Sequence, residues 1–474
     1  MYKKLFVLLL AALVNCGKTS VKSAALKETV EWMGVYVSGQ KIGYNYLKEN
    51  AENGKFHFVQ KSTMQIEMLG TNETIRMNLD AITDSSFNLE EFTFDVDSRQ
   101  RRFYASGKRE GSKILIEVKS AGRIKRTEVA ASGDVLLVPV IAQWTMAQSP
   151  QPGDAWTVNV FEPLFLKILP VRIKAIAAEN ISMEDGSVIP AMKFETSMLG
   201  LRSFSWVDST GRSIKELQEP GITMLLESQE KAMAGLSAAE QLDLLSCFAV
   251  KPDSNIANPR GLSELRIILK GKLPSDSLVF SSSTQKASYA KDGVHLLISI
   301  PNTTQLKQVS IPITEPKEFL IPSVYIQSED AAIKKKAFEI IASEKDALTA
   351  GRLLTEWVYK NLNKRATASV PSAVEVLETL EGDCNEHAIL LAALGRAVGI
   401  PTKINVGLVY LNGAFYYHAW NSFYLGDVWL PVDATFGQFP ADPTHVQLNE
   451  GELDEQARVL SIVDKIKIDV ISYK

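Results

Sequence analysis

The chain has 474 residues, of which 46% are apolar and 22% are charged, and its formal net charge is −4. This length suggests about two to four domains, and the apolar share allows ordinary buried cores, which excludes a disordered chain. No long run of Lys or Arg occurs. Nucleic acid is therefore not expected as a partner.

The first residues have the features of an export signal. Lys3 and Lys4 precede ten apolar residues, 5–14, a run too short for a bilayer, which needs about 20 residues. It fits the apolar region of a secretory signal peptide. The end of the run, Leu-Val-Asn-Cys16, resembles a bacterial lipoprotein processing site in which Cys16 receives the lipid. We expect an exported cell-envelope protein, lipid-anchored and periplasmic or on the cell surface; a plain signal peptide cut near Cys16 is the alternative.

Residues 27–228 alternate between apolar and polar side chains, which predicts an antiparallel β-rich domain. Its architecture resembles the wrapped sheets of exported lipoproteins. A long apolar segment, 135–148, is predicted as a helix lying on the sheet. The expected strands are 30–37, 42–47, 56–68, 87–96, 113–118, 156–161, 171–177 and 204–208.

The remainder of the chain divides into four predicted segments: a helical connector at 229–250, a small β-rich module at 255–320, an α+β domain at 328–450 and a C-terminal extension at 451–474. Strands are expected in the module at 263–269, 277–281, 294–300 and 309–313. Helices are expected at 331–341, at 353–362 after a break near Gly351, and at 373–380, with strands following. The fold class is thus α+β, preceded by mostly antiparallel β domains.

Cys384 lies where a helix is expected to begin. Gly382 and Asp383 precede it, an amphipathic pattern follows, and Gly399-Ile400-Pro401 ends the helix in the usual way. The unpaired amides and the positive end of the dipole at a helix N-terminus favour a thiolate. The same amides could stabilise an oxyanion.

A nucleophilic thiol needs a base, and the base needs an orienting acid. Tight turns at 412–413 and 426–427 predict a three-strand meander over 403–411, 414–425 and 428–435. Counting from these turns places Trp420 opposite Asp433 and Thr435 opposite His418. Since alternate residues share a face, His418 and Asp433 become diagonal neighbours, about 7–8 Å apart.

The same register places Gly407 opposite His418, with open space beside the imidazole. His387, three residues after Cys384 on the same helix face, is a rival base without an evident acid partner. Gly407, His387 and Trp420 are possible substrate-side residues, and His445 is interpreted as a loop residue. The five His residues are scattered, without His-Glu-x-x-His or Cys-x-x-Cys spacing, so no metal or cofactor is expected.

These motifs together resemble the transglutaminase-like core family over about residues 330–450. The residues that carry the resemblance are Gly382-Asp383-Cys384, Arg396 to Pro401, His418-Ala419-Trp420 and Trp429 to Thr435. The resemblance implies a papain-like fold, with helices packed on an antiparallel sheet, and chemistry through an acyl-enzyme. It assigns Cys384 as the nucleophile, His418 as the base and then the acid, and Asp433 as the group that holds His418. Asn421 and Ser422 stand where an acidic residue is common in the family, which concerns substrate binding.

We therefore expect a cysteine-dependent acyl-transfer enzyme that hydrolyses a peptide or another amide, with a protein or peptide as substrate. Protein cross-linking by amine transfer is an alternative, because the outcome depends on whether water or an amine reaches the acyl-enzyme. A further alternative is a non-catalytic binding lipoprotein that kept the fold.

Overall fold

The computed structural model describes residues 28–474 apart from 69–70, 99–100, 220, 236–248, 272, 274–280, 366–369, 371 and 464. The predicted signal peptide, the predicted lipid site at Cys16 and the strand predicted at 277–281 lie largely or wholly outside the described residues. Within the described ranges, no helix combines the length and apolar character needed to cross a bilayer.

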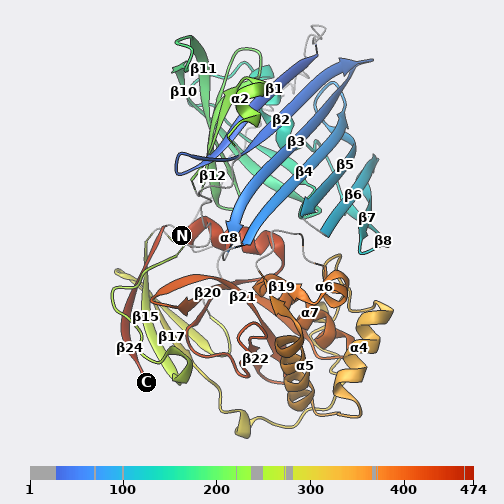
Figure 1. The fold of residues 1–474 in the computed structure, drawn as a ribbon, viewed down its shortest axis with the longest axis vertical. Helices are drawn as coiled ribbons and strands as arrows, with labels where there is room; N and C mark the ends of the chain where they lie inside the picture. Colours follow the sequence, from blue (N-terminus) through green and yellow to red (C-terminus); the bar gives the residue numbers. More distant parts are fainter. Residues whose placement is uncertain are drawn as a thin grey trace, which may run out of the picture.

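The N-terminal half forms a single large antiparallel sheet (Figure 1). Its strand order is β8-β7-β6-β5-β4-β3-β2-β1-β14-β13-β12-β11-β10-β9. The strands are β1 Thr29–Val37, β2 Gln40–Glu52, β3 Lys55–Met68, β4 Thr71–Thr83, β5 Leu89–Ser98, β6 Arg101–Glu110, β7 Lys113–Ser120, β8 Arg123–Ala130, β9 Ala155–Glu162, β10 Lys167–Ser182, β11 Val188–Met198, β12 Leu201–Val207, β13 Ser213–Gln218 and β14 Ile222–Glu227. Each strand predicted from the alternating pattern overlaps one of these.

The sheet curls so that distant strands share a core. Phe92 on β5 packs against Phe161 on β9 with 4.9 Å between the ring centroids, although the two strands are far apart in the strand order. The short helices η1 (Val138–Val140) and α1 (Ile141–Ala147) pack into this curled sheet, so the helix predicted at 135–148 is confirmed in a shorter form. In the predicted connector, α2 (Gln229–Met233) is helical and most of the rest lies outside the described residues.

A second, four-stranded sheet is made from two distant parts of the chain. Its order is β16-β17-β15-β24, with β15 Glu264–Gly271, β16 Gln285–Ala290, β17 Gly293–Ser299 and β24 Ile466–Tyr473. The last segment is therefore not an appendage, because it supplies helix α8 (Leu453–Val463) and the strand that pairs with β15. The strand predicted at 309–313 is wrong: Ser310 makes one isolated bridge with Asp346, and Pro312 lacks the amide that a strand needs.

The remaining helices pack on a third sheet. The helices are α4 Ala331–Ile341, α5 Ala347–Asn361, α6 Ala373–Thr379 and α7 Cys384–Ala397, and short 3-10 turns occur at η2 Pro259–Gly261, η3 Thr303–Gln305 and η4 Lys317–Phe319. The sheet order is β22-β21-β20-β23, with β20 Thr402–Leu411, β21 Ala414–Tyr424, β22 Trp429–Val432 and β23 His445–Glu450, and β18 Asn363–Lys364 pairs in parallel with β19 Glu381–Gly382. This arrangement confirms the predicted α+β class.

The predicted break near Gly351 is wrong, because Gly351 lies inside α5. A Cβ at this position would stand 3.0 Å from the ring of Phe423 on β21. The glycine therefore lets α5 approach the sheet closely. Helix α7 is buried along most of its length, and it packs against β21 on one side and against the other helices on the other.

The large sheet lies against the C-terminal half, with α8 close to the junction (Figure 1). Among the residues that the structure describes, ion pairs join the two parts at four places: Arg101 to Glu386, Arg123 to Asp330 and Glu378, Lys167 to Asp454, and Lys465 to Glu219.

Candidate active site

Cys384 is the first residue of α7, as its neighbours in the sequence predict. Asp383 is the N-cap, and its Oδ1 accepts a hydrogen bond of 2.9 Å from the amide of Asn385. Glu386 Oε2 accepts the amide of Asp383, also at 2.9 Å, which completes a capping box. Gly382 leaves room for this turn, since a Cβ there would lie 2.2 Å from the Cβ of Glu386.

His418 and Asp433 come from neighbouring strands in the predicted register. Gly407 pairs with His418, and β21 pairs with β22 from Asn421–Val432 to Tyr424–Trp429. The strand ends at Val432, and Asp433 opens a turn that closes on Gln438 through two backbone hydrogen bonds of 2.9 and 2.8 Å. The predicted pairing of Thr435 with His418 is therefore wrong, and Thr435 instead donates its amide to Asp433 Oδ1.

The side chains of His418 and Asp433 meet in the interior. His418 Nε2 lies 2.9 Å from Asp433 Oδ2, and the two residues are 4% and 0% exposed. This bond places the Nε2 proton between the ring and the carboxylate, so Nδ1 is the ring nitrogen left for a thiol. Cys384 approaches the same strand, because a hydrogen bond from the amide of Ala419 acts to lower the pKa of its thiol.

Burial nevertheless has the largest effect on the pKa of the Cys384 thiol. It raises the pKa of Cys384 well above the ordinary value, and the charges of Asp383, Glu386 and Asp433 raise it further. The expectation of a thiolate in the resting protein is thus contradicted, because the opposing amides do not offset burial. Burial also lowers the pKa of His418, against the pull of Asp433, so the imidazole is neutral at neutral pH and can accept a proton.

Asp433 remains ionised despite its complete burial. Burial acts to raise its pKa, but His418 and His445 outweigh burial and hold the pKa well below the ordinary value. The amides of Thr435 and Phe436 donate to Oδ1, while the two imidazoles share Oδ2. Each carboxylate oxygen of Asp433 therefore has two hydrogen-bond partners, and the carboxylate is fixed in position.

His445, interpreted from the sequence as a loop residue, is a second imidazole on the same carboxylate. It begins β23 and is 5% exposed, and its Nε2 lies 3.0 Å from Asp433 Oδ2. Its Nδ1 lies 3.0 Å from the carbonyl oxygen of Asp442. Burial acts to lower the pKa of His445, but hydrogen bonds to Asp433 and Asp442 raise it to about 9. Both ring nitrogens face acceptors, so the imidazolium form satisfies the site.

This network extends into the module that precedes the helices. Arg260 bonds to Asp442 Oδ2 at 2.7 Å, and it also donates to Thr444 Oγ1 and to the carbonyl of Tyr410. The guanidinium lies over the ring of Phe436, 4.6 Å from its centroid. That ring in turn stacks on His418, with the ring centroids 5.1 Å apart.

The three possible substrate-side residues are all buried. Trp420 is 2% exposed and stacks beneath His418, so it supports the imidazole from inside. His387 is 0% exposed, and its Nδ1 lies 2.6 Å from the carbonyl of Asp383. The predicted open space beside Gly407 is filled, because a Cβ there would lie 2.0 Å from the carbonyl oxygen of Val446 on β23. All three thus lie in the interior around His418 and Cys384, and their contact with a substrate stays a prediction.

His418, Asp433 and His445 also form a group of side chains that could hold a metal ion. Their ligand atoms all lie within 4.8 Å of one another. The separations of 2.9 and 3.0 Å match hydrogen bonds, and both imidazoles use Nε2 for the carboxylate. A metal here would displace the protons that this network holds.

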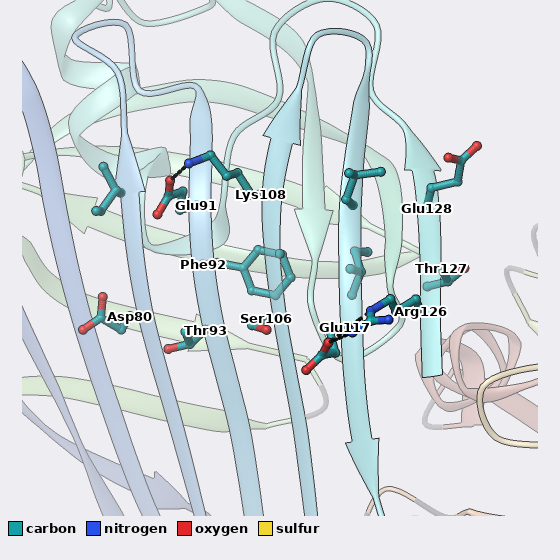
Figure 2. A pocket seen from close by; sticks show the side chains of 14 residues that line it. Asp80, Glu91, Phe92, Thr93, Ser106, Lys108, Glu117, Arg126, Thr127 and Glu128 are labelled. Carbon is teal, nitrogen blue, oxygen red and sulfur yellow. Dashed lines mark hydrogen bonds and ion pairs between the residues drawn. The ribbon is translucent and has the colours of Figure 1, made fainter. Parts of the chain in front are cut away.

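A pocket of about 730 Å³ lies elsewhere, on strands β4 to β8 (Figure 2). The ring of Phe92 is visible at its centre, and a Cβ on Gly107 would come within 2.4 Å of that ring. Its charged walls are largely paired, as Lys108 with Glu91 and Arg126 with Glu117. The described residues that line it include neither a cysteine nor a histidine.

Comparison with known proteins identifies the domain that carries this geometry. Residues 334–434 match the model of the transglutaminase-like superfamily, so the chain contains a domain of this superfamily. No curated protein matches the chain.

The solved structures to which the chain is similar include two candidate proteases and a β-barrel-like protein. A candidate cysteine protease from Cytophaga hutchinsonii is 20% identical, covers 45% of this chain and 86% of its own, and has a TM-score of 0.30. A β-barrel-like protein of unknown function from Brucella abortus is 9% identical over 42% of this chain and 96% of its own, with a TM-score of 0.34. A candidate protease from Parabacteroides distasonis is 12% identical over 70% of this chain and 63% of its own, with a TM-score of 0.19. These likenesses are too distant to assign a reaction.

Proposed function

We propose that the transglutaminase-like domain is a cysteine-dependent acyl-transfer enzyme in which Cys384, His418 and Asp433 form the catalytic triad. The observation that carries the proposal is the buried hydrogen bond between His418 and Asp433, which leaves Nδ1 free on the strand that Cys384 approaches. A scaffold has no need to bury a neutral base on an ionised acid beside a helix N-terminus. The substrate we propose is a protein or peptide, and no cofactor takes part.

The reaction begins from a neutral pair. As Cys384 Sγ attacks the carbonyl carbon of an amide, His418 Nδ1 takes the thiol proton, because burial keeps that proton on sulfur beforehand. The resulting oxyanion is stabilised by amides at the start of α7. His418 then returns the proton to the leaving amine, and the C–N bond breaks to leave a thioester. Asp433 stabilises the transient imidazolium through Oδ2.

Water completes the hydrolysis that we favour. His418 removes a proton from water as its oxygen attacks the thioester, and the thiol leaves with that proton. An amine in place of water would give a cross-linked product by the same steps, which is the alternative reaction. Asn421 is buried and donates to the carbonyl of Ala388, so it ties β21 to α7 and is not positioned as a charged recognition group.

The decisive test combines an electrophilic probe with matched variants. The purified protein would be treated with a peptide-like vinyl sulfone, and the modified cysteine would be mapped by mass spectrometry, since Cys16 and Cys247 are also present. We expect modification of Cys384 that falls at least tenfold in His418→Ala and Asp433→Asn. His57→Ala is the control, because His57 is exposed and binds Asp80 on the large sheet.

Equal modification in all these variants would contradict the triad and favour the non-catalytic binding role. Hydrolysis and cross-linking are separated by supplying a fluorescent amine with candidate acceptor proteins. Incorporation of the amine that depends on Cys384 would favour cross-linking, and release of a free carboxylate without incorporation would favour hydrolysis.

We also propose that the protein is exported and anchored through a lipid on Cys16. The basic and apolar start of the sequence supports this proposal. Cells that express the protein would be given a labelled fatty acid, and label is expected in the wild type and absent in Cys16→Ala. Cleavage near residue 16 without label would indicate a plain signal peptide.

A further inference from the structure

Arg101 crosses from the large sheet into the C-terminal half of the molecule. It is the first residue of β6 and is 7% exposed. Its Nη1 lies 2.8 Å from Glu386 Oε1, and its Nη2 contacts Thr379 Oγ1 at 3.3 Å and the carbonyl oxygen of Glu381. All three partners lie in α6, in β19 or at the start of α7.

Glu386 links Arg101 to the residue that precedes Cys384. It is 1% exposed, and its two oxygens have different partners. Oε1 accepts the guanidinium of Arg101, and Oε2 accepts the amide of Asp383, the residue directly before Cys384. The capping box that defines the first turn of α7 is therefore held from outside its own domain.

We propose that Arg101 is a positioning residue for Cys384, so that the large sheet supplies a part of the active site that the transglutaminase-like domain lacks. This inference rests on the proposed function, since it concerns the same nucleophile. Arg101 does not touch the reacting atoms. It acts through Glu386, by fixing the carboxylate that caps the helix and by balancing its charge.

The other ion pairs between the two parts of the molecule differ from this one. The side chains of Arg123, Lys167 and Lys465 are 41%, 52% and 24% exposed, whereas that of Arg101 is 8% exposed. Exposed pairs are screened by water and hold surfaces together only weakly. A buried guanidinium with three acceptors fixes geometry, and its loss leaves a buried carboxylate without its partner.

The surroundings of Arg101 carry further acidic groups. Burial raises the pKa of Glu375 to about 7, and the charge of Arg101 opposes that rise. Burial likewise raises the pKa of Glu73, on β4, against the charges of Arg365 and Arg101. Arg101 thus offsets negative charge contributed by both halves of the molecule.

The titration of Cys384 reports on this arrangement. The ionisable groups that act on its thiol are Asp383, the N-cap of its helix, Glu386 on that helix, Tyr417 on β21 and Asp433 beyond β22. Because Glu386 already raises the pKa of the thiol, removal of its cationic partner is expected to raise that pKa further.

The experiment measures the rate of iodoacetamide modification at Cys384 against pH, with thermal unfolding recorded for each protein. Arg101→Met is expected to move the midpoint upward by about one pH unit and to lower the rate at pH 7.5 about tenfold. Arg101→Lys keeps the positive charge but lacks the two Nη donors of the guanidinium, so it should move the midpoint less. Arg101→Met with Glu386→Gln should move the midpoint back toward that of the wild type, because the carboxylate whose charge Arg101 balances is gone.

Arg123→Met is the matched control. Arg123 also joins the large sheet to the C-terminal half, but its partners are Asp330, the N-cap of α4, and Glu378 on α6. It should leave the midpoint unchanged even if it lowers the melting temperature. Equal titration curves for Arg101→Met and Arg123→Met would overturn the inference, and should Arg101→Met fail to fold, Arg101→Lys carries the comparison.

The two proposals fail in different ways. A Cys384 titration that is unaffected by His418→Ala would contradict the triad, while the effect of Arg101 on the thiol could still be measured. A titration that responds to His418→Ala but not to the Arg101 variants would leave the triad in place and remove the positioning role.

Discussion

Asp433 serves two imidazoles through one oxygen, and the second of these, His445, distinguishes this site from a simple triad. His445 is cationic at neutral pH because Asp433 and Asp442 raise its pKa to about 9 against burial. It therefore keeps Asp433 ionised and fixed while His418 remains neutral. The sequence placed Cys384 at the start of a helix from local signals, and it placed His418 near Asp433 because turn residues allow the register to be counted. It did not reveal His445, whose position depends on β23 pairing with β20.

We predict that His445→Gln lowers kcat/KM about tenfold, equivalent to about 1.4 kcal/mol of transition-state stabilisation. A glutamine amide can still donate to Asp433, but it brings no charge. Steady-state kinetics on whichever peptide substrate the probe experiments identify would measure the change. His295→Gln is the control, because His295 is exposed and binds Asp292; a loss of the same size in both variants would argue against the role of His445.

Among the structural elements, the bounds of α4, α6 and α7 are predicted well, whereas the start of α5 and the end of β22 are not. The start of α7 follows from local signals, Gly382 and Asp383, which act within one turn. The end of β22 does not, because Asp433 leaves the ladder to close a turn on Gln438. Edge strand β8 was also missed: it alternates partly buried and exposed positions, but its charged side chains conceal the pattern.

The close approach of β23 to β20 gives a prediction at this scale. Gly407→Ala would place a Cβ 2.0 Å from the carbonyl oxygen of Val446. Since backbone must move to admit it, we expect a loss of about 1–3 kcal/mol in the free energy of unfolding. Activity should fall as well, because the displaced strand begins with His445.

Denaturant unfolding would measure that loss. The control is Leu411→Ala, at the exposed end of β20, the strand that contains Gly407. Leu411 is 39% exposed, and its truncation should change stability by less than about 0.5 kcal/mol. Unchanged stability in Gly407→Ala would mean that β23 does not press on β20 as described.

At the scale of the whole molecule, the strand order of the large sheet lay beyond sequence reasoning. Alternation predicts strands and their inner faces, but it does not say that β1 pairs with β14 or that β5 packs against β9. The large sheet also buries an acidic side chain. Glu31 is 5% exposed and lines a cavity of about 160 Å³ together with Asn45 and Glu216. Burial, followed by the charge of Glu49, raises the pKa of Glu31 to about 8.

This group gives a stability prediction whose sign depends on pH. In the unfolded chain Glu31 ionises near its ordinary pKa of about 4.3, whereas in the folded protein it stays protonated up to about pH 8. The unfolded state is therefore increasingly favoured as pH rises from about 4.5 to 8. Glu31→Gln should be nearly neutral at pH 4.5 and stabilising at pH 8, by an amount on the order of 3 kcal/mol.

Thermal unfolding at the two pH values would measure the difference. Glu28→Gln is the control, since the side chain of Glu28 is 57% exposed and pairs with Lys48. A gain of equal size at both pH values would show that packing and not ionisation is responsible.

Strand β24 has a consequence for how the protein matures during synthesis. It pairs with β15, whose partner residues lie about two hundred positions earlier, and Gln285 on β16 of the same sheet bonds to the backbone of Gln447 on β23. While a ribosome is still adding residues 466–473, β15 lacks the neighbour that β24 provides. The second sheet, which contacts β23 through Gln285, is then incomplete. A chain that stalls before residue 466 would consequently carry Cys384 with the second sheet incomplete, and we expect the reactivity of its thiol to depend on β24 being in place.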